Sequence, residues 1–134
     1  MNKALWTVEH IGMPVSDPGK LQDWYVRVLD GEIVWQDDSG SVFFVRLNGG
    51  IILEIGPAKG VVKETGDNTI AGFRHLALQV ESIEAARDVL QDRGVVFTED
   101  PKAAGGGGRV LFFADPEGNL LHLVERPENS VFAL

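Results

Sequence analysis

An internal repeat is the sequence feature that most constrains how this chain of 134 residues can fold. His10 in the first half corresponds to His75, at a spacing of 65 residues. Further along each copy the spacing becomes 68, so that Phe44 corresponds to Phe112. A segment that recurs in this way is one supersecondary unit that cannot bury its hydrophobic surface alone. We therefore expect two copies of one unit that join in a larger curved sheet.

Hydrophobic residues in each copy predict one helix and four strands. In the first copy we expect a strand over 6–15, a helix from Pro18 to Asp30-Gly31, and strands over 32–36, 42–47 and 51–55. In the second copy we expect a strand over 73–80, a helix from Ser82 to Arg93, and strands over 95–98, 109–114 and 119–125. The fold class is therefore α+β: two repeated β-α-β-β-β modules, about 6–57 and 73–126, that form a curled mixed sheet. A connector over 58–72 completes a single domain spanning 1–134.

Strand parity places four metal-binding side chains on one predicted face. If the apolar alternate residues of each first strand pack under the helices, His10 and His75 face the opposite, concave side. Glu54 and His122, which correspond at the spacing of 68, alternate with apolar neighbours and point the same way. Histidine and carboxylate ligands suit Zn, Ni, Mn, Fe or Co better than Ca or Mg. A single inward histidine is more often a hydrogen-bonded core residue, so the hypothesis of a metal site depends on the four residues together.

Composition excludes several other classes of function. The net charge of −8 argues against nucleic acid as a partner, because binding to phosphates requires a concentrated basic surface. The chain has no cysteine, which excludes disulfides and thiolate chemistry. No apolar run is long enough to cross a membrane, and Met1-Asn2-Lys3 leads into no signal-peptide core. We therefore expect a cytoplasmic protein that contacts neither nucleic acid nor membrane.

The remaining candidate residues are weaker. Lys102 and Arg109 flank the glycine run 105–108, which is either a mobile flap over the site or a plain flexible connection. In the first case both cations are available to an anionic substrate group. Trp35 and Phe44 are candidates for substrate binding, although aromatic residues on strands are more often part of the core.

These residues and motifs together resemble the vicinal oxygen chelate superfamily, which includes glyoxalase I, extradiol dioxygenases, and fosfomycin and bleomycin resistance proteins. The motifs that carry the resemblance are Glu9-His10, the helix end from Trp24-Tyr25 to Leu29-Asp-Gly31, Arg74-His75-Leu-Ala-Leu, and Asp115-Pro-Glu-Gly118. The resemblance implies one divalent metal per site, bound by His10, Glu54, His75 and His122. In glyoxalase I-like members the last position is usually Glu. With His122 the ligand set keeps one carboxylate, so Glu54 is the obvious general base and an anionic bound species is favoured.

The resemblance implies a metal-dependent lyase or isomerase similar to glyoxalase I (lactoylglutathione lyase), acting on a small substrate with vicinal oxygens. It also implies a homodimer, with the site inside one chain or across two. Two alternatives stay open. One is an Fe- or Mn-dependent extradiol-type dioxygenase using the same residues, and the other is a non-catalytic drug- or metabolite-binding resistance protein.

Overall fold

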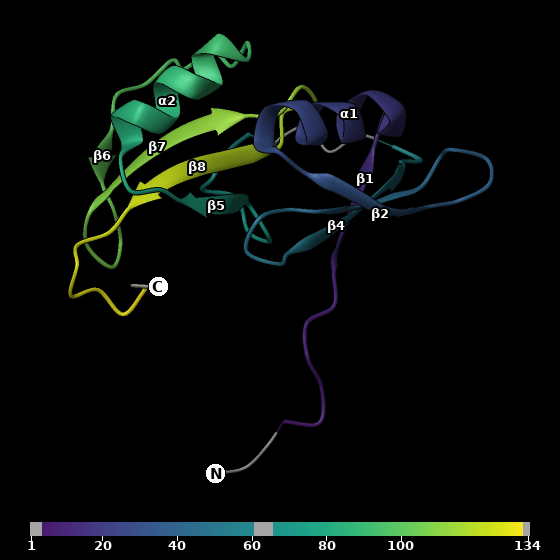
Figure 1. Cartoon of the computed structure of the whole chain (residues 1–134), viewed down its shortest axis with the longest axis horizontal. Coiled ribbons are helices and arrows are strands. Elements are labelled where there is room, and N and C mark those ends of the chain that lie inside the picture. The colour runs from purple at the N-terminus through teal and green to yellow at the C-terminus, as the bar shows by residue number, and fades with distance from the viewer. Residues whose placement is uncertain (1–3, 61–65, 133–134) are drawn as a thin grey trace. The chain divides into compact units, whose positions relative to one another are not determined.

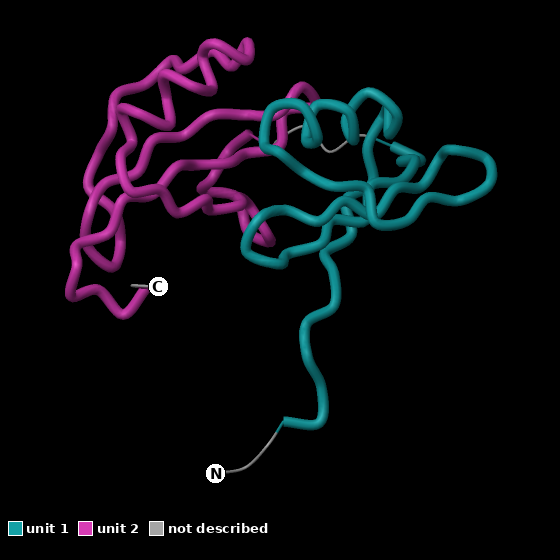
Figure 2. The backbone as a smooth tube through the Cα atoms, in the orientation of Figure 1, with its two compact units in different colours: residues 1–61 teal, residues 62–134 magenta. Residues whose placement is uncertain are grey.

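The computed structural model describes residues 4–60 and 66–132 and divides the chain into two compact units. Unit 1 comprises residues 1–61 and unit 2 comprises residues 62–134 (Figure 2). The boundary falls inside the predicted connector over 58–72, of which residues 61–65 lie outside the described ranges. Each half of the repeat is thus a compact unit with a sheet and a helix of its own.

Unit 1 is a four-stranded mixed sheet with one helix (Figure 1). The strand order is β1-β4-β3-β2, in which β1 runs parallel to β4 and the other neighbours are antiparallel. Helix α1 packs against β3 and β4, and its buried side chains are Leu21, Tyr25 and Val28. The elements are β1 (Ile11–Val15), α1 (Pro18–Leu29), β2 (Glu32–Gln36), β3 (Phe43–Arg46) and β4 (Ile52–Pro57).

Unit 2 repeats this topology with strand order β5-β8-β7-β6. Its elements are β5 (His75–Gln79), α2 (Ile83–Asp92), β6 (Lys102–Ala103), β7 (Arg109–Ala114) and β8 (Leu120–Glu125). The predicted α+β class of two β-α-β-β-β modules is confirmed. Within the described residues, however, hydrogen bonds link the strands into two separate sheets and not into one continuous sheet.

The pairing register confirms the correspondence that the sequence repeat predicts. Phe44 lies opposite Glu54 in the β3–β4 pair, and Phe112 lies opposite His122 in the β7–β8 pair. The second pair lies 68 residues after the first, which is the spacing found in the sequence. Glu54 and His122 therefore occupy equivalent points of the two sheets.

The turns that precede β4 and β8 also share one geometry. The N–H of Leu47 donates to the carbonyl of Ile51 at 2.8 Å, and the N–H of Asp115 donates to the carbonyl of Asn119 at 2.9 Å. Gly118 closes the second turn at a φ of 86°, a conformation that glycine adopts without steric cost. In both units the same turn thus sets the register of the strand that carries the candidate ligand.

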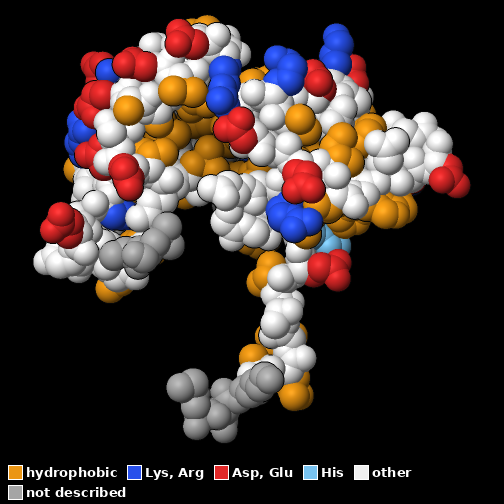
Figure 3. Space-filling view, viewed as in Figure 1, with side chains coloured by type: hydrophobic (Ala, Val, Ile, Leu, Met, Phe, Trp, Pro, Cys, Tyr) orange, Lys and Arg blue, Asp and Glu red, His pale blue; other side chains and the backbone are white. Residues whose placement is uncertain are grey.

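The first strand starts later than its sequence pattern predicts. We expected a strand from Trp6, but β1 begins at Ile11. The preceding residues lead away from the sheet of unit 1, and the side chains of Leu5, Trp6 and Val8 are exposed (Figure 1). In the space-filling view, hydrophobic side chains line this segment, and acidic and basic side chains intermingle over the rest of the visible face (Figure 3). Alternating hydrophobicity alone does not create a strand, because the backbone also needs a partner for its hydrogen bonds.

The prediction of a strand over 95–98 is wrong. That segment contains no strand; the short β6 lies further along the chain and pairs with β7. Val95 is buried, and the ring of Phe97 lies 5.4 Å from that of Phe113. Val95 and Phe97 therefore pack by their side chains without joining a ladder, whereas Val96 is exposed. None of the helices in the described ranges is long and apolar enough to span a bilayer.

Candidate metal centre

Unit 1 brings together two of the predicted ligands, His10 and Glu54. Atom Nε2 of His10 lies 4.0 Å from Oε1 of Glu54, which is too long for a hydrogen bond. Two ligands bound to one ion at about 2.1 Å each can stand up to about 4.2 Å apart. The distance therefore fits two donors that share a cation. Both side chains are partly exposed, so a ligand can reach them.

The two aromatic side chains predicted to bind substrate lie beside this pair. Phe44 is the cross-strand neighbour of Glu54, and its ring stands edge-on to that of His10 at 5.2 Å. Trp35 in turn stands edge-on to Phe44 at 5.6 Å and is half exposed. The rings of His10, Phe44 and Trp35 thus form a row that begins at a candidate ligand and ends at the half-exposed Trp35.

Unit 2 brings together the other two predicted ligands, His75 and His122. Their ring centroids are 4.6 Å apart, with the planes tilted by 42°. The ring of Phe112 lies 4.9 Å from that of His122 and 5.7 Å from that of His75. Phe112 thus has the place in unit 2 that Phe44 has in unit 1.

His122 is buried, with 6% of its surface exposed. Its Nδ1 is a buried polar atom that has no hydrogen-bond partner among the described residues. Leaving such an atom unpaired costs about 1–3 kcal/mol, so its burial is better suited to a site that engages a ligand than to a core. Burial, together with the positive charges of His75 and Arg126, lowers the pKa of His122 below its ordinary value. A neutral imidazole is the form that binds metals.

A polar side chain that the sequence reasoning missed contacts His75. Nδ1 of His75 donates to Oδ1 of Asn68 at 2.7 Å. Asn68 lies in a turn in which the carboxylate of Asp67 accepts from both the N–H and the hydroxyl of Thr69, at 2.9 and 2.6 Å. The Asp-Asn-Thr sequence is a turn signal, but it did not reveal which histidine the turn would meet.

Lys102, a predicted substrate-binding residue, lies at this cluster. Its Nζ is 4.9 Å from the centroid of the Phe112 ring and 3.7 Å from a carboxylate oxygen of Glu99. Lys102 pairs with Val110 across β6 and β7, so it shares strand parity with Phe112. Its ammonium group is therefore available near the two histidines of unit 2.

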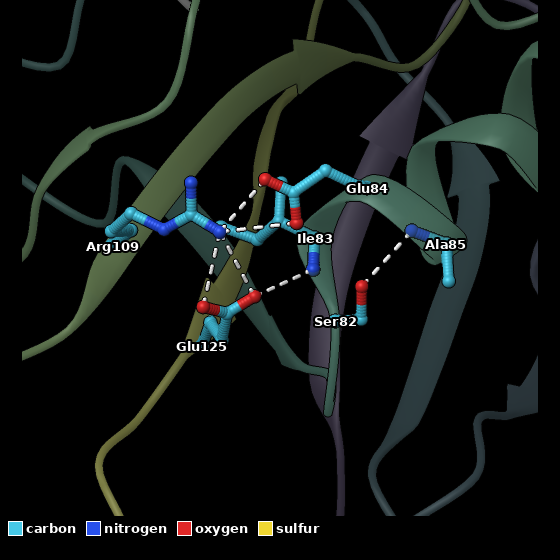
Figure 4. Close-up of polar contacts among 6 residues, drawn as sticks. All are labelled: Ser82, Ile83, Glu84, Ala85, Arg109 and Glu125. Atoms are coloured by element: carbon cyan, nitrogen blue, oxygen red, sulfur yellow. Dashed lines mark hydrogen bonds and ion pairs between the residues drawn. The ribbon is translucent and has the colours of Figure 1, made fainter.

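Arg109 does not lie with Lys102, contrary to what the flanking positions around the glycine run suggested. Its parity is opposite to that of Phe112, and its guanidinium contacts Glu84 of α2 at 2.9 Å and Glu125 at 3.1 Å (Figure 4). Glu125 also contacts the start of α2. Its carboxylate accepts from the N–H of Ile83 at the start of α2, at 2.8 Å. A substrate role for Arg109 would require it to give up two carboxylate partners.

The glycine run 105–108 is attached to the residues that follow β8. Nη1 of Arg126 donates to the carbonyls of Gly105 and Gly107, at 2.5 and 2.8 Å. The guanidinium of Arg126 also lies 4.2 Å from the ring centroid of Phe132. In this structure the run is a connection held by an arginine; its predicted role as a flap stays a prediction.

The described residues supply the predicted ligands as two pairs, one in each unit. No group of three or more His, Cys, Asp or Glu side chains within 4–60 and 66–132 stands close enough together to hold an ion. His10 and Glu54 form one pair and His75 and His122 the other, at equivalent sheet positions. The donor types fit a divalent transition metal or zinc.

This chain belongs to the Glyoxalase/Bleomycin resistance protein/Dioxygenase superfamily, whose family model matches residues 7–123. The resemblance that the sequence motifs indicated is thereby confirmed. The chain is also 29% identical, over 129 residues, to the uncharacterized protein YwkD of Bacillus subtilis (strain 168). That alignment covers 91% of this chain and 98% of YwkD.

Two solved structures illustrate the range of this fold. TnmS3, an antibiotic binding protein from Streptomyces sp. CB03234, is 26% identical, with a TM-score of 0.68, covering 94% of this chain and 100% of TnmS3. The fosfomycin resistance protein FosX of Listeria monocytogenes, complexed with Mn(II) and sulfate, has a TM-score of 0.68 at 18% identity. That match covers 92% of this chain and 93% of FosX, and it shows a shared fold. Proteins of this fold thus include one crystallised with Mn(II) and one described as an antibiotic binding protein.

Proposed function

We propose that this protein is a divalent-metal-dependent enzyme resembling glyoxalase I, a lyase or isomerase acting on a small substrate with vicinal oxygens. The observation that carries the proposal is the equivalence of the two donor pairs. Glu54 and His122 occupy the same register position of the two sheets, and each lies beside a histidine. The repeat thus offers a pair of metal-competent side chains at the same place in each unit, which supports a shared role for them.

In the proposed site, His10, Glu54, His75 and His122 hold one divalent ion, either Zn, Ni, Mn, Fe or Co. The ion supplies Lewis-acid stabilisation of negative charge on the substrate oxygens. Three neutral histidines and one carboxylate leave such a centre with a net positive charge, which favours an anionic substrate. Lys102, whose ammonium lies beside Phe112, adds to this preference.

Glu54 is the proposed general base, because it is the only carboxylate among the four residues. Its carboxylate takes a proton from the substrate carbon next to a carbonyl and returns it to the neighbouring carbon. The rings of Phe44 and Trp35 next to it offer an apolar surface for the rest of the substrate. The half-exposed side chain of Glu54 can reach substrate without a large rearrangement.

Metal analysis of untagged protein tests the ligand set. We expect a stoichiometric divalent metal in the wild-type protein and its loss in His10→Ala and in His75→Ala. Glu128→Gln, which changes an exposed residue, serves as a control and should keep the metal. Absence of bound metal in the wild type, or unchanged metal content in both histidine variants, would contradict the proposal.

Replacement of His122 by Glu tests the type of reaction. A second carboxylate would restore the ligand set usual in glyoxalase I-like proteins, and we expect His122→Glu to gain or increase glyoxalase activity on hemithioacetals. Glu54→Gln should abolish that activity because it removes the base. Oxygen-dependent turnover of catechols by the wild type would instead assign the Fe- or Mn-dependent dioxygenase function.

A non-catalytic binding protein is the second candidate, favoured by the likeness to the antibiotic binding protein TnmS3 and by the exposed Trp35 beside Phe44. In that case metal-free protein would bind an aromatic compound without turnover, and Trp35→Ala would weaken the binding.

We also propose that the protein is cytoplasmic and that it forms a homodimer. Light scattering can test the dimer. If the two donor pairs of one site come from different chains, mixing His10→Ala with His122→Ala should restore one of the two metal sites in each mixed dimer, which is about a quarter of all sites after random exchange of equal amounts. If they come from one chain, mixing should restore none.

A further inference from the structure

We infer that Glu9 and Asn68 are positioning residues that fix which ring nitrogen of His10 and His75 is free to bind a metal. Neither residue belongs to the proposed ligand set. The inference rests on the proposed function for its consequence in metal affinity, whereas its structural part concerns the metal-free protein.

The contact between Glu9 and His10 determines the tautomer of that histidine. Nδ1 of His10 lies 2.9 Å from Oε1 of Glu9. An ionised carboxylate only accepts hydrogen bonds, so Nδ1 must carry the proton. In the neutral ring the lone pair is then on Nε2, the atom that lies 4.0 Å from Glu54. The Nε2 lone pair and the carboxylate oxygen are two acceptors, which a shared cation or a water that donates to both can satisfy.

Asn68 has the same effect on His75 through a neutral group. Its Oδ1 accepts from Nδ1 of His75 at 2.7 Å, and this leaves the lone pair of His75 on Nε2. The turn around Asp67 holds Asn68 in place, since two hydrogen bonds from Thr69 end on the Asp67 carboxylate. These hydrogen bonds lower the pKa of Asp67, so the carboxylate stays ionised over a wide pH range.

The two partners differ in charge, which gives the two histidines different strengths as donors. Hydrogen-bond partners of this kind orient a ligand ring and raise its basicity, and their loss typically lowers metal affinity about 10- to 100-fold. A carboxylate raises basicity more than an amide does. Glu9 also adds a negative charge near a ligand set that has only one carboxylate, Glu54.

Nitrogen-15 NMR of the imidazole rings in metal-free protein tests the tautomers directly. At roughly pH 8.5, where ordinary histidines are neutral, we expect protonated Nδ1 in both His10 and His75 of the wild type. Asn68→Ala should convert His75 to a mixture of tautomers, and Glu9→Ala should do so for His10. Asn68→Asp and Glu9→Gln retain an acceptor oxygen and should retain the wild-type tautomers. Asn129→Ala, an exposed control, should change neither ring.

Zinc titration by calorimetry gives the second readout. We expect Asn68→Ala and Glu9→Ala each to weaken zinc binding about 10-fold or more, and the acceptor-retaining variants to weaken it less. Protonated Nε2 in the wild-type rings, or tautomers and zinc affinity unchanged in both alanine variants, would overturn the inference. Failure of the wild type to bind any divalent metal would overturn the proposed function alone, because the tautomers are measured without metal.

Discussion

Units 1 and 2 share a backbone plan, yet they place chemically different side chains at the same point of it. Glu54 and His122 stand opposite Phe44 and Phe112 in the same register, but Glu54 is partly exposed whereas His122 is buried. The ladder tolerates this difference because its hydrogen bonds come from the main chain alone. At position 122, burial then lowers the pKa of the imidazole below its ordinary value.

The helices of the two units are attached to their sheets by different forces. Helix α1 buries Leu21, Tyr25 and Val28, including a large aromatic ring. Helix α2 buries only Ile83 and Leu90, and its first turn is joined to the sheet by charged groups (Figure 4). Unit 2 therefore depends more on polar contacts for the placement of its helix.

The loops that join the second and third strands of each unit differ as well. The loop between β2 and β3 is organised by Asp37, whose carboxylate accepts from the N–H groups of Ser41 and Val42 at 2.8 and 3.0 Å. Hydrogen bonds from Val42, Ser39 and Ser41 hold the pKa of Asp37 well below its usual range. The loop between β6 and β7 instead uses glycines at positive φ, including Gly108 at 92°.

The largest expected effect comes from a substitution in this glycine loop. A Cβ added at Gly108 would overlap the carbonyl oxygen of Glu125, at a backbone conformation that side chains rarely adopt. We expect Gly108→Ala to lower the free energy of unfolding by at least ~3 kcal/mol, measured by urea denaturation.

Gly105→Ala is the matched control in the same run. A Cβ at Gly105 meets no atom within 4 Å. This variant should stay within about 0.5 kcal/mol of the wild type. Equal stability losses for the two variants would show that the run has no position with a specific requirement for glycine.

A smaller effect should follow from loss of the charged attachment of α2. Arg109→Met keeps much of the apolar stem but removes the contacts to Glu84 and Glu125. We expect a lower Tm and faster hydrogen exchange at the N–H of Ile83, because Glu125 is then less well held in its position beside α2. Raised salt should narrow the difference between variant and wild type.

Arg27→Met provides the comparison in unit 1. Arg27 contacts Asp23 at 2.6 Å on the exposed surface of α1 and does not join the helix to the sheet. This variant should change Tm little, as expected for an exposed pair within one helix. If both variants lowered Tm equally, the charged attachment would not be specific to unit 2.

The smallest expected effect concerns the pH dependence of stability in metal-free protein. Burial lowers the pKa of His122 from its ordinary value of 6.5, so below pH 6.5 the unfolded chain binds a proton that the folded chain does not. Stability should therefore fall as pH decreases from 6.5 and level off below the pKa in the folded state.

Urea denaturation between pH 8 and pH 5 checks this prediction against His122→Gln, which cannot titrate there. The variant should lose less stability over the interval than the wild type. An identical pH dependence of the two proteins would show that His122 titrates in the folded state as it does in the unfolded chain.

Much of this molecule follows from local patterns in the sequence. The sequence predicted the α+β class and the bounds of β2 and β7. It also predicted that Glu54 and His122 occupy corresponding positions of the two units. They could be predicted because alternation, helix caps and turn residues act over a few neighbouring positions. The repeat supplied the correspondence between positions of the two halves, and the structure supplied the pairing register of the strands.

The tertiary structure decided what these patterns leave open. Residues 95–98 have the composition of a strand but form none, and Arg109 contacts the carboxylates of Glu84 and Glu125. Asn68 reaches His75 from a connector whose sequence indicates a turn and nothing about its partner. The sequence alone determined the repeat, the strand parity and the kind of donor at each position. Burial of His122 and the carboxylate partners of Arg109 depend on contacts between residues distant along the chain, which no local pattern encodes.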